Sequence, residues 1–193
     1  MSRIWASYNR LLETAPLLTK ALTSFTGFTA GDALAQTFVE PGDKPYDYLR
    51  TLKMGSFGLL IHGTTGHYFY GLLDSKLPGT KPVTVATKVL IDQTLWNPCF
   101  GLMFFGYLNA VEGKSMSEYK DKIEQDLQTA VMGSWAVWVP AHTINFGFVP
   151  PAQRLLYINT IQIGYNIFLS FLGNKEVEGG EEVKEKGEIK KEL

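Results

Sequence analysis

The stretch WVPAHTINFGFVPPAQR, residues 138–154, lies between two predominantly apolar parts of the chain. It contains Pro140, Pro150 and Pro151, with polar side chains among apolar neighbours. Proline lacks a backbone N–H and disfavours the interior of a helix. We therefore expect the preceding helix to end near Val139, a non-helical segment to follow, and a new helix to begin after Pro151.

The part of the chain after this stretch predicts one more long helix and then a tail. Residues 152–173 are mainly apolar, and they are long enough to cross a hydrocarbon layer of about 30 Å at about 1.5 Å per residue. Residues 175–193 are rich in Lys and Glu and contain no aromatic side chain. A segment of that composition cannot bury enough apolar surface to fold, so we expect it to be disordered.

Upstream of the stretch, helix-start signals divide the chain into three further long segments. Pro16 and Pro82 suit the first position of a helix, and Asp47 suits an N-cap. None of the segments is a continuous apolar run, and the prediction rests on their length between breakers. The four expected spans are residues 16–39, 48–73, 82–111 and 152–173. The sequence thus predicts an all-α membrane bundle of four spanning helices in one domain, residues 1–174.

Two amphipathic helices are expected beside the spans. Near the N-terminus, apolar side chains recur at helical spacing on one face between Ile4 and Leu12, as in an interfacial helix, an uncleaved targeting element or a first helix packed on the bundle. In the centre, Ser115 and Glu118 form a capping-box pattern. The helix that follows carries many charges on one face, so we expect it to lie along the membrane surface.

The composition favours a membrane protein over a soluble one. Charged residues make up 19 %, below the roughly 25 % of soluble domains, and the charged tail accounts for many of them. A net charge of −1 gives no basic surface for nucleic acid, so no nucleic-acid partner is expected. Cys99 is the only cysteine, which excludes an internal disulfide; we expect it to be a small buried apolar residue.

Polar residues inside the expected spans are the candidates for function. A carboxylate in hydrocarbon is costly, so Asp32 and Asp92 should pair with a cation or face water. Lys88 and Asp92 have the i,i+4 spacing of a pair within one helix. Two interpretations remain open: buried structural pairs, or the polar lining of a water-filled path. The candidate residues are Asp32, Gln36, Arg50, His67, Asp92, Gln93, Asn97, His142, Asn145 and Arg154.

Small residues on the first expected span favour close helix packing. Gly27, Gly31 and Ala35 recur every fourth position, which lets two helices approach closely in a membrane. The sequence contains no recognisable motif for catalysis or for metal binding. The histidines lack the spacing of metal ligands, and there is no G-x-S-x-G elbow and no phosphate-binding loop. We expect no metal, no cofactor and no enzymatic activity.

Several motifs in order resemble the Mpv17/PMP22 family of organelle membrane proteins. The opening PLLTKALTSF…GDALAQ, the D-x-x-R of Asp47 and Arg50, the element GTTGHYFYGLLD at residues 63–74, and Asp92-Gln93 followed by Pro98 are similar to elements of that family. The stretch at residues 138–154 resembles its C-terminal signature. The chain departs from the family pattern at Pro140, which lies one place later than usual, and at four residues of other types: Thr64, Phe69, His142 and Tyr165.

The resemblance implies an integral protein of the mitochondrial inner membrane or, as the alternative, the peroxisomal membrane. Members of the family are described as non-selective or weakly selective channels for small solutes, and no catalytic residues come with it. The expected partners are the lipid bilayer, small solutes and further copies of the chain in a homo-oligomer. A channel that supports mitochondrial metabolite balance is the first hypothesis, and a non-conducting scaffold of the membrane is the alternative. In the channel, Asn145 and Arg154 would plug or line one mouth.

Overall fold

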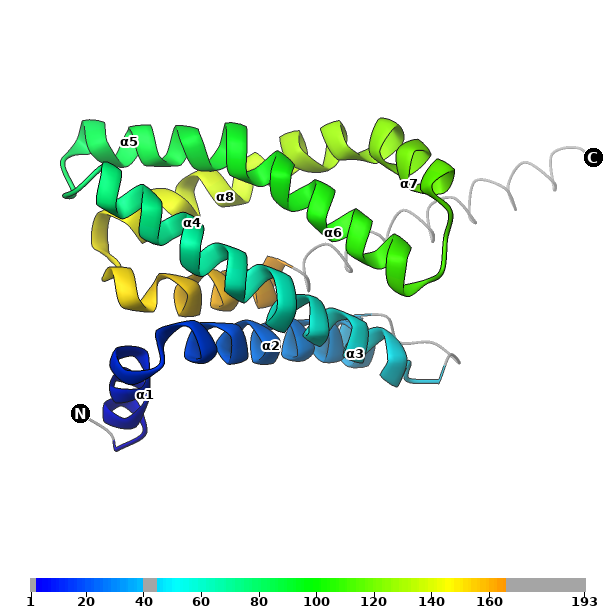
Figure 1. The fold of residues 1–193 in the computed structure, drawn as a ribbon, viewed down its shortest axis with the longest axis horizontal. Coiled ribbons are helices and arrows are strands. Elements are labelled where there is room, and N and C mark those ends of the chain that lie inside the picture. Colours follow the sequence, from blue (N-terminus) through cyan, green and yellow to red (C-terminus); the bar gives the residue numbers. More distant parts are fainter. Residues whose placement is uncertain (1–2, 40–44, 166–193) are drawn as a thin grey trace, which may run out of the picture.

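The computed structural model describes residues 3–39 and 45–165 of the 193-residue chain (Figure 1). These ranges consist of helices joined by short turns and contain no β-strand, which confirms the all-α prediction. The tail at residues 175–193, expected to be disordered, lies outside the described residues, as does the end of the last expected span, residues 166–173.

The helices follow one another in long, nearly continuous rods. The first helices are α1 (Arg3–Thr14), α2 (Pro16–Leu34), η1 (Ala35–Val39), α3 (Tyr48–Phe57), η2 (Gly58–His62) and α4 (Gly63–Lys76). They are followed by α5 (Pro82–Ile91), η3 (Asp92–Trp96), α6 (Asn97–Val111), α7 (Met116–Lys122), η4 (Ile123–Leu127), α8 (Gln128–Phe148) and η5 (Pro151–Gln153). The segments η1 to η4 are π-helical turns that continue the neighbouring α-helices. A final helix occupies residues 154–165, up to the limit of the described residues.

Local chemistry explains where most helices begin. Pro16 and Pro82 each occupy the first turn of their helix, where a missing N–H costs no hydrogen bond. The Asp47 carboxylate accepts a hydrogen bond from the backbone N–H of Arg50 over 2.9 Å and caps α3. Ser115 and Glu118 form the complete capping box of α7. These four predicted helix starts are confirmed.

The expected break at Pro140 is wrong. Helix α8 continues through Pro140 to Phe148 and ends only before Pro150, where the backbone of Val149 becomes extended. A proline inside a helix removes one hydrogen bond and costs about 3 kcal/mol. Downstream of it, α8 buries Ala141, His142, Asn145 and Phe146 against the rest of the bundle, and this tertiary packing keeps the segment helical. Helix α8, the first part of which was expected to lie along the membrane surface, packs along α5 and α6 as a member of the bundle.

Helix α2 packs along the rod formed by α3, η2 and α4 (Figure 1). The closest approach is made by glycines of that rod: a Cβ at Gly58 would lie 2.5 Å from the carbonyl oxygen of Ser24, and one at Gly63 would lie 2.5 Å from the Cα of Ala21. Residue numbers rise along one rod as they fall along the other in these contacts, so the two rods are antiparallel. Of the small residues expected to pack, Gly27 abuts Asn159 of the final helix, whereas Gly31 and Ala35 are buried.

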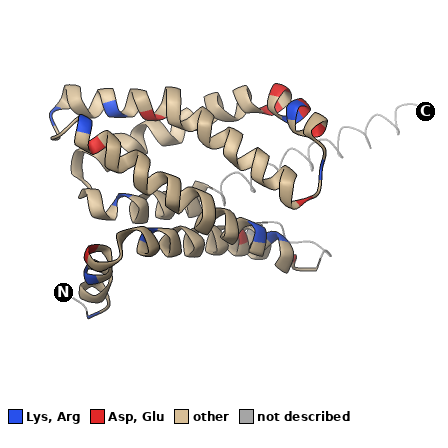
Figure 2. Cartoon of the chain, viewed as in Figure 1, with Lys and Arg blue, Asp and Glu red and all other residues tan. Residues whose placement is uncertain are grey.

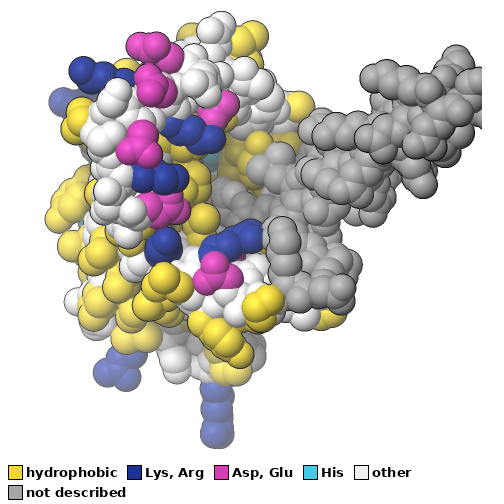
Figure 3. Space-filling view, turned by 90° about the vertical axis from the view of Figure 1, so that its right-hand side faces the viewer, with side chains coloured by type: hydrophobic (Ala, Val, Ile, Leu, Met, Phe, Trp, Pro, Cys, Tyr) yellow, Lys and Arg dark blue, Asp and Glu magenta, His cyan; other side chains and the backbone are white. Residues whose placement is uncertain are grey.

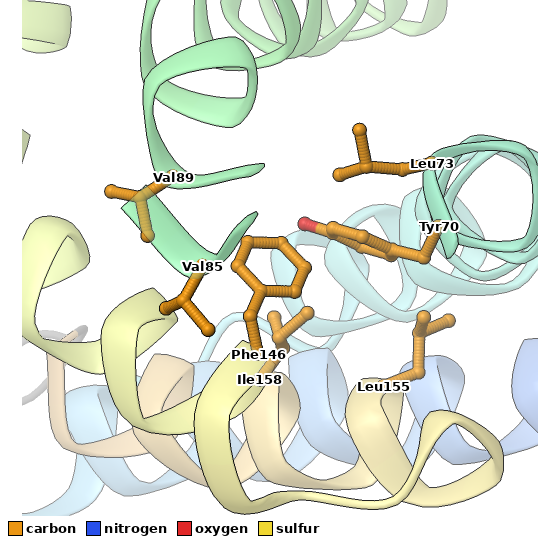
Figure 4. Packing of buried hydrophobic residues seen from close by; sticks show 7 residues of the cluster. All are labelled: Tyr70, Leu73, Val85, Val89, Phe146, Leu155 and Ile158. Atoms are coloured by element: carbon orange, nitrogen blue, oxygen red, sulfur yellow. The ribbon is translucent and has the colours of Figure 1, made fainter. Parts of the chain in front are cut away.

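The apolar core joins four rods at one level of the bundle (Figure 4). Its buried members come from α4, α5, α8 and the final helix: Tyr70, Leu73, Val85, Val89, Phe146, Leu155 and Ile158. Cys99, expected to be buried, is exposed on α6. No helix in residues 3–39 and 45–165 unites the length and the apolar character required of a membrane-crossing segment. The four expected spans therefore stay a prediction.

Candidate functional site

Three polar clusters, each centred on a carboxylate, lie inside the bundle. The Asp32 cluster consists of Asp32, Gln36, Arg50 and Thr51. The Asp92 cluster consists of Tyr70, Asp92, Gln93 and His142. The Asp74 cluster consists of Asp74, Lys88 and Arg154. Figure 2 shows that much of each long rod between the ends of the bundle carries no charged residue, which makes these few interior charges conspicuous.

The Asp32 cluster fastens η1 and the end of α2 to the start of α3. Arg50 donates from Nε to Oδ1 of Asp32 over 2.8 Å, and the hydroxyl of Thr51 donates to Oδ2 over 2.6 Å. The side-chain amide of Gln36 donates to the same Oδ2 over 2.7 Å. Asp32 itself is only 3 % exposed. The candidate residues Asp32, Gln36 and Arg50 are therefore brought together, as a charge pair whose carboxylate also accepts hydrogen bonds.

The Asp92 cluster lies deeper and contains no lysine or arginine. Tyr70 donates its hydroxyl hydrogen to Oδ1 of Asp92 over 3.0 Å, and the amide of Gln93 donates to Oδ2 over 2.7 Å. His142 places Nε2 at 3.3 Å from the same Oδ2. Asp92 is 1 % exposed and His142 is 4 % exposed. The cluster thus joins α4, η3 and α8 through one carboxylate.

Asn97 extends the Asp92 cluster toward the middle of α8. Its side-chain amide donates to Oε1 of Gln93 over 3.2 Å and to the hydroxyl of Ser134 over 2.9 Å. Ser134 in turn donates to the carbonyl oxygen of Val131. A chain of hydrogen bonds therefore runs from Asp92 along one side of η3 to α8.

The Asp74 cluster overturns the predicted pairing of Lys88 with Asp92. Lys88 donates instead to Oδ1 of Asp74 over 2.7 Å, and Arg154 donates from Nη1 to the same oxygen. Helical spacing allows an i,i+4 pair, but Lys88 points toward α4, where Asp74 lies at the turn into α5. Both cations face the ring of Phe146, whose centre lies 5.9 Å from Lys88 Nζ and 5.2 Å from the central carbon of the Arg154 guanidinium.

A further buried contact connects the histidine of η2 with the final helix. Nδ1 of His62 lies 3.0 Å from the hydroxyl oxygen of Ser24, and the amide of Asn159 donates to that hydroxyl oxygen over 3.1 Å. All three residues are buried. Ser24 thereby links α2 to two other rods.

A central cavity of about 350 Å³ reaches both the Asp32 cluster and the Asp92 cluster. Its wall is largely aromatic, with rings from α6 such as Phe100 and Phe104 and with Trp96 and Trp138 near Asp92. The sequence-predicted residues that line it are Asp32, Arg50, Asp92, Gln93, Asn97 and His142. The cavity is large enough for a small organic solute or several waters.

The other candidate residues lie away from this cavity. Gln36 holds Asp32 from the side of η1, and Arg154 belongs to the Asp74 cluster. Asn145 is fully buried, and neither of its side-chain amide atoms forms a hydrogen bond within the described residues. The same is true of Nδ1 of His67, which is a buried atom.

Sequence reasoning missed several members of the clusters. Asp74 follows the expected span of residues 48–73 directly and was not among the candidates, although it lies seven residues after His67 and hence two helical turns along the same face of α4. Tyr70 and Ser134 gave no signal, because isolated hydroxyl groups are common in any helix. Thr51 follows Arg50 directly, and its hydrogen bond to Asp32 exists only because α2 packs against α3.

Charges are interspersed at the end of the bundle that carries α7, which faces the viewer in Figure 3. Lys114 donates to Glu112 over 2.7 Å and holds the pKa of that carboxyl below its usual range. Lys122 pairs with Asp126 over 2.5 Å along the same helical rod. Among the described residues, no group of three His, Cys, Asp or Glu side chains is placed to hold a metal ion.

Comparisons with known proteins point to one family. Residues 109–170 match the model of the Mpv17 / PMP22 family. The chain is 34 % identical over 152 residues to "Protein SYM1" of Mycosarcoma maydis, covering 78 % of this chain and 76 % of that protein. It is 30 % identical over 176 residues to "Peroxisomal membrane protein 2" of Bos taurus, covering 89 % of this chain and 90 % of the relative.

A mitochondrial relative is equally similar. "Mitochondrial inner membrane protein Mpv17" of Xenopus laevis is 30 % identical over 176 residues, which is 91 % of this chain and 99 % of that protein. No solved structure matches the chain.

Proposed function

Because the chain belongs to the Mpv17/PMP22 family, we propose that it is an integral protein of an organelle membrane whose helical bundle forms a channel for small solutes. The relatives' names refer to the peroxisomal membrane and the mitochondrial inner membrane. The proposal involves the lipid bilayer, small solutes and a homo-oligomer of this chain as partners. It includes no catalytic step, no cofactor, no metal and no nucleic acid.

The distribution of side chains supports the membrane part of the proposal. Leu18, Leu60 and Leu90 are 59 %, 61 % and 61 % exposed on three different rods, whereas Lys88 and Asp92 are each 1 % exposed. For a protein surrounded by water this arrangement is unfavourable in two ways. The exposed leucines keep apolar surface in contact with water, and the buried Lys88 and Asp92 have lost their hydration. In lipid the exposed leucines would be favourably placed, Lys88 would keep its ion pair with Asp74, and Asp92 would keep its hydrogen bonds from Tyr70 and Gln93.

The central cavity is the observation that carries the channel part of the proposal. It is about 350 Å³ in volume and meets a charge pair at the Asp32 cluster and a carboxylate at the Asp92 cluster. Polar groups at both clusters can exchange hydrogen bonds with a solute, while the aromatic wall between them restricts its size.

Electrophysiology in planar bilayers tests the channel directly. Purified wild-type protein should give discrete conductance steps, and Asp92→Asn should change their size or ion preference, because it removes a carboxylate from the cavity wall. Asp126→Asn is the matched control, since this carboxylate is 43 % exposed and pairs only with Lys122 among the described residues. Equal conductance in wild type and Asp92→Asn would remove Asp92 from the path.

We propose the mitochondrial inner membrane as the location, with the peroxisomal membrane as the alternative, and metabolite balance of the organelle as the role. Imaging of the tagged full-length protein against markers of both organelles distinguishes them. Protein found at the plasma membrane or in the cytosol would contradict both locations.

A non-conducting scaffold is the second candidate, and one observation favours it. The carboxylate of each cluster is already held by two or more side chains: Asp32 by Arg50 and Thr51, Asp74 by its two cations, and Asp92 by Tyr70 and Gln93. Such clusters suffice to fix helix positions without any solute. A well-folded wild type that is silent in the bilayer, together with an unfolding-prone Asp92→Asn variant, would select the scaffold.

A further inference from the structure

The Asp74 cluster carries an excess of positive charge in a buried place. Lys88 and Arg154 are 1 % and 2 % exposed, and both are bound to a single oxygen of Asp74. Among the described residues, these two cations share one carboxylate, which leaves one positive charge without a carboxylate partner. A buried charge of this kind costs several kcal/mol unless a counter-ion or hydrogen-bond acceptors reach it.

A third cation, Lys20, adds to this excess. It forms no hydrogen bond or ion pair within residues 3–39 and 45–165, yet it lies within electrostatic reach of both Asp74 and Arg154. Its backbone packs against Gly63, since a Cβ there would lie 3.0 Å from the Lys20 carbonyl oxygen. Side chains lean toward the N-terminus of their helix. Because α2 is antiparallel to α4, this direction leads from Gly63 toward Asp74.

An unused hydrogen-bonding group lies on the same path. His67 is one helical turn beyond Gly63 on α4, within electrostatic reach of Lys20. Its Nδ1 is buried and has no hydrogen-bond partner among the described residues. A neutral imidazole can donate from either ring nitrogen. Arg154 has five N–H donors, and its hydrogen bonds to Asp74 and to the carbonyl of Val149 use Nη1 and Nε.

The surroundings of this cluster suit an anion from outside the protein. The turn between α4 and α5 carries the exposed Lys76 and Lys81. Helix α1 lies at the same end of the bundle (Figure 1), and Ile4 and Leu11 on it are 83 % and 53 % exposed. A hydrogen bond of 2.9 Å from Gln153 to Asn9 ties α1 to the start of the final helix. Basic groups beside an exposed apolar helix are typical of contact with anionic headgroups.

We propose that Lys20, His67 and Arg154 form a binding site for a phosphate group at the α1 end of the bundle, with Asp74 holding Arg154 in place. Phosphate offers several acceptor oxygens, so donors from α2, α4 and the final helix can bind it together. Its negative charge would compensate the excess charge of the cluster. The phosphate belongs either to a lipid headgroup or to a soluble ion or ester.

Binding to the full-length protein in neutral detergent tests the site and identifies the source. One arm adds phosphatidylglycerol or, as reference, phosphatidylcholine to the micelles. The other arm adds sodium phosphate or sodium chloride at equal ionic strength. The readouts are the thermal unfolding midpoint and the lipids retained in native mass spectrometry. A midpoint raised by phosphatidylglycerol alone indicates a headgroup, and one raised equally by inorganic phosphate indicates a soluble ligand.

Lysine substitutions distinguish binding at this site from nonspecific electrostatic attraction of anions to the basic end of the bundle. Lys20→Gln should weaken binding about tenfold, because a hydrogen bond to a charged group is lost. Lys20→Arg should retain most of it. Lys81→Gln removes the same charge from an exposed position at the same end and should bind as wild type does. No shift in wild type with either phosphate source, or equal losses in Lys20→Gln and Lys81→Gln, would overturn the proposal. The assay does not require conduction, so a silent channel leaves it intact.

Discussion

The hydroxyl group of Tyr70 donates a hydrogen bond of 3.0 Å to Oδ1 of Asp92 and so connects α4 with the first residue of η3. Both side chains are buried, at 4 % and 1 % exposure. This contact occurs where the apolar core meets the central cavity, because Tyr70 belongs to both. The aromatic ring stabilises the core, and the hydroxyl group helps to satisfy the carboxylate.

Tyr70→Phe should therefore lower the free energy of unfolding by about 1–3 kcal/mol, because a buried acceptor loses a donor while the ring is kept. Chemical denaturation of the purified protein measures the loss. Tyr68→Phe is the control, since Tyr68 is 64 % exposed and its hydroxyl deletion should be close to neutral. Equal effects of the two substitutions would argue against the importance of this contact.

Two glycine substitutions should have opposite signs. Gly58→Ala places a Cβ 2.5 Å from the Ser24 carbonyl oxygen, a backbone atom that cannot move alone, and should destabilise by about 2–3 kcal/mol or more. Gly71→Ala meets nothing within 4 Å and should stabilise α4 by about 0.5–1 kcal/mol. Thermal midpoints of both variants test this, and a stabilising Gly58→Ala would show that α2 and η2 can separate freely.

Asp74→Asn should be more destabilising than Lys88→Met. The first change leaves two buried cations facing each other and should cost about 3–5 kcal/mol. The second removes one cation, keeps most of its apolar volume and leaves the Asp74–Arg154 pair. Denaturant titrations give the order of the two losses. The reverse order would mean that Asp74 is not the counter-ion that holds this end together.

The start of α7 should depend on pH through its capping box. The backbone and hydroxyl groups of Ser115 donate to Glu118 and lower the pKa of its carboxyl below the ordinary 4.5. A lowered pKa means that the stabilisation is complete above about pH 4.5 and is lost as the pH falls through the lower, folded value. The protection factors of the α7 amides, which relate the observed exchange to the intrinsic rate at the same pH, should fall in that acid range.

The matched variant for this helix is Ser115→Ala, which removes the cap and should destabilise the helix start by about 1 kcal/mol. In it, α7 should exchange faster at neutral pH and respond less to acid. Exchange that is unchanged by the substitution at every pH would refute the stabilising role of the cap.

The sequence predicts those features of the fold that depend on nearby residues. Pro16, Pro82, Asp47 and Ser115 begin helices as expected, because caps and prolines act within one helical turn. Pro140 was misjudged for the opposite reason. Its local cost is outweighed by the burial of residues from other rods, which no window of sequence around it contains.

The candidate site could be predicted only in part. The sequence shows that Asp32 needs a cation or water, because a carboxylate in a helix core is costly, but only the packing of α2 against α3 selects Arg50 as its partner. Asp92 lies four residues from Lys88 and is the nearer candidate in sequence, but the actual partner of Lys88 is Asp74 on α4. Only the packing of α4 against α5 decides between the two. Likewise, the glycines that allow α2 to approach its neighbouring rod most closely are Gly58 and Gly63 of that rod. The sequence pattern singles out Gly27 and Gly31 on α2 instead.

The two cations on Asp74 have an implication for the order in which the chain assembles. Lys88 is 14 residues from Asp74, whereas Arg154 is 80 residues away. Closing the longer loop costs about 1.5 kcal/mol more in chain entropy. Lys88 also leaves the ribosome long before Arg154 does. We therefore expect the lysine to pair with the carboxylate first, and the arginine to join it last, when the final helix docks.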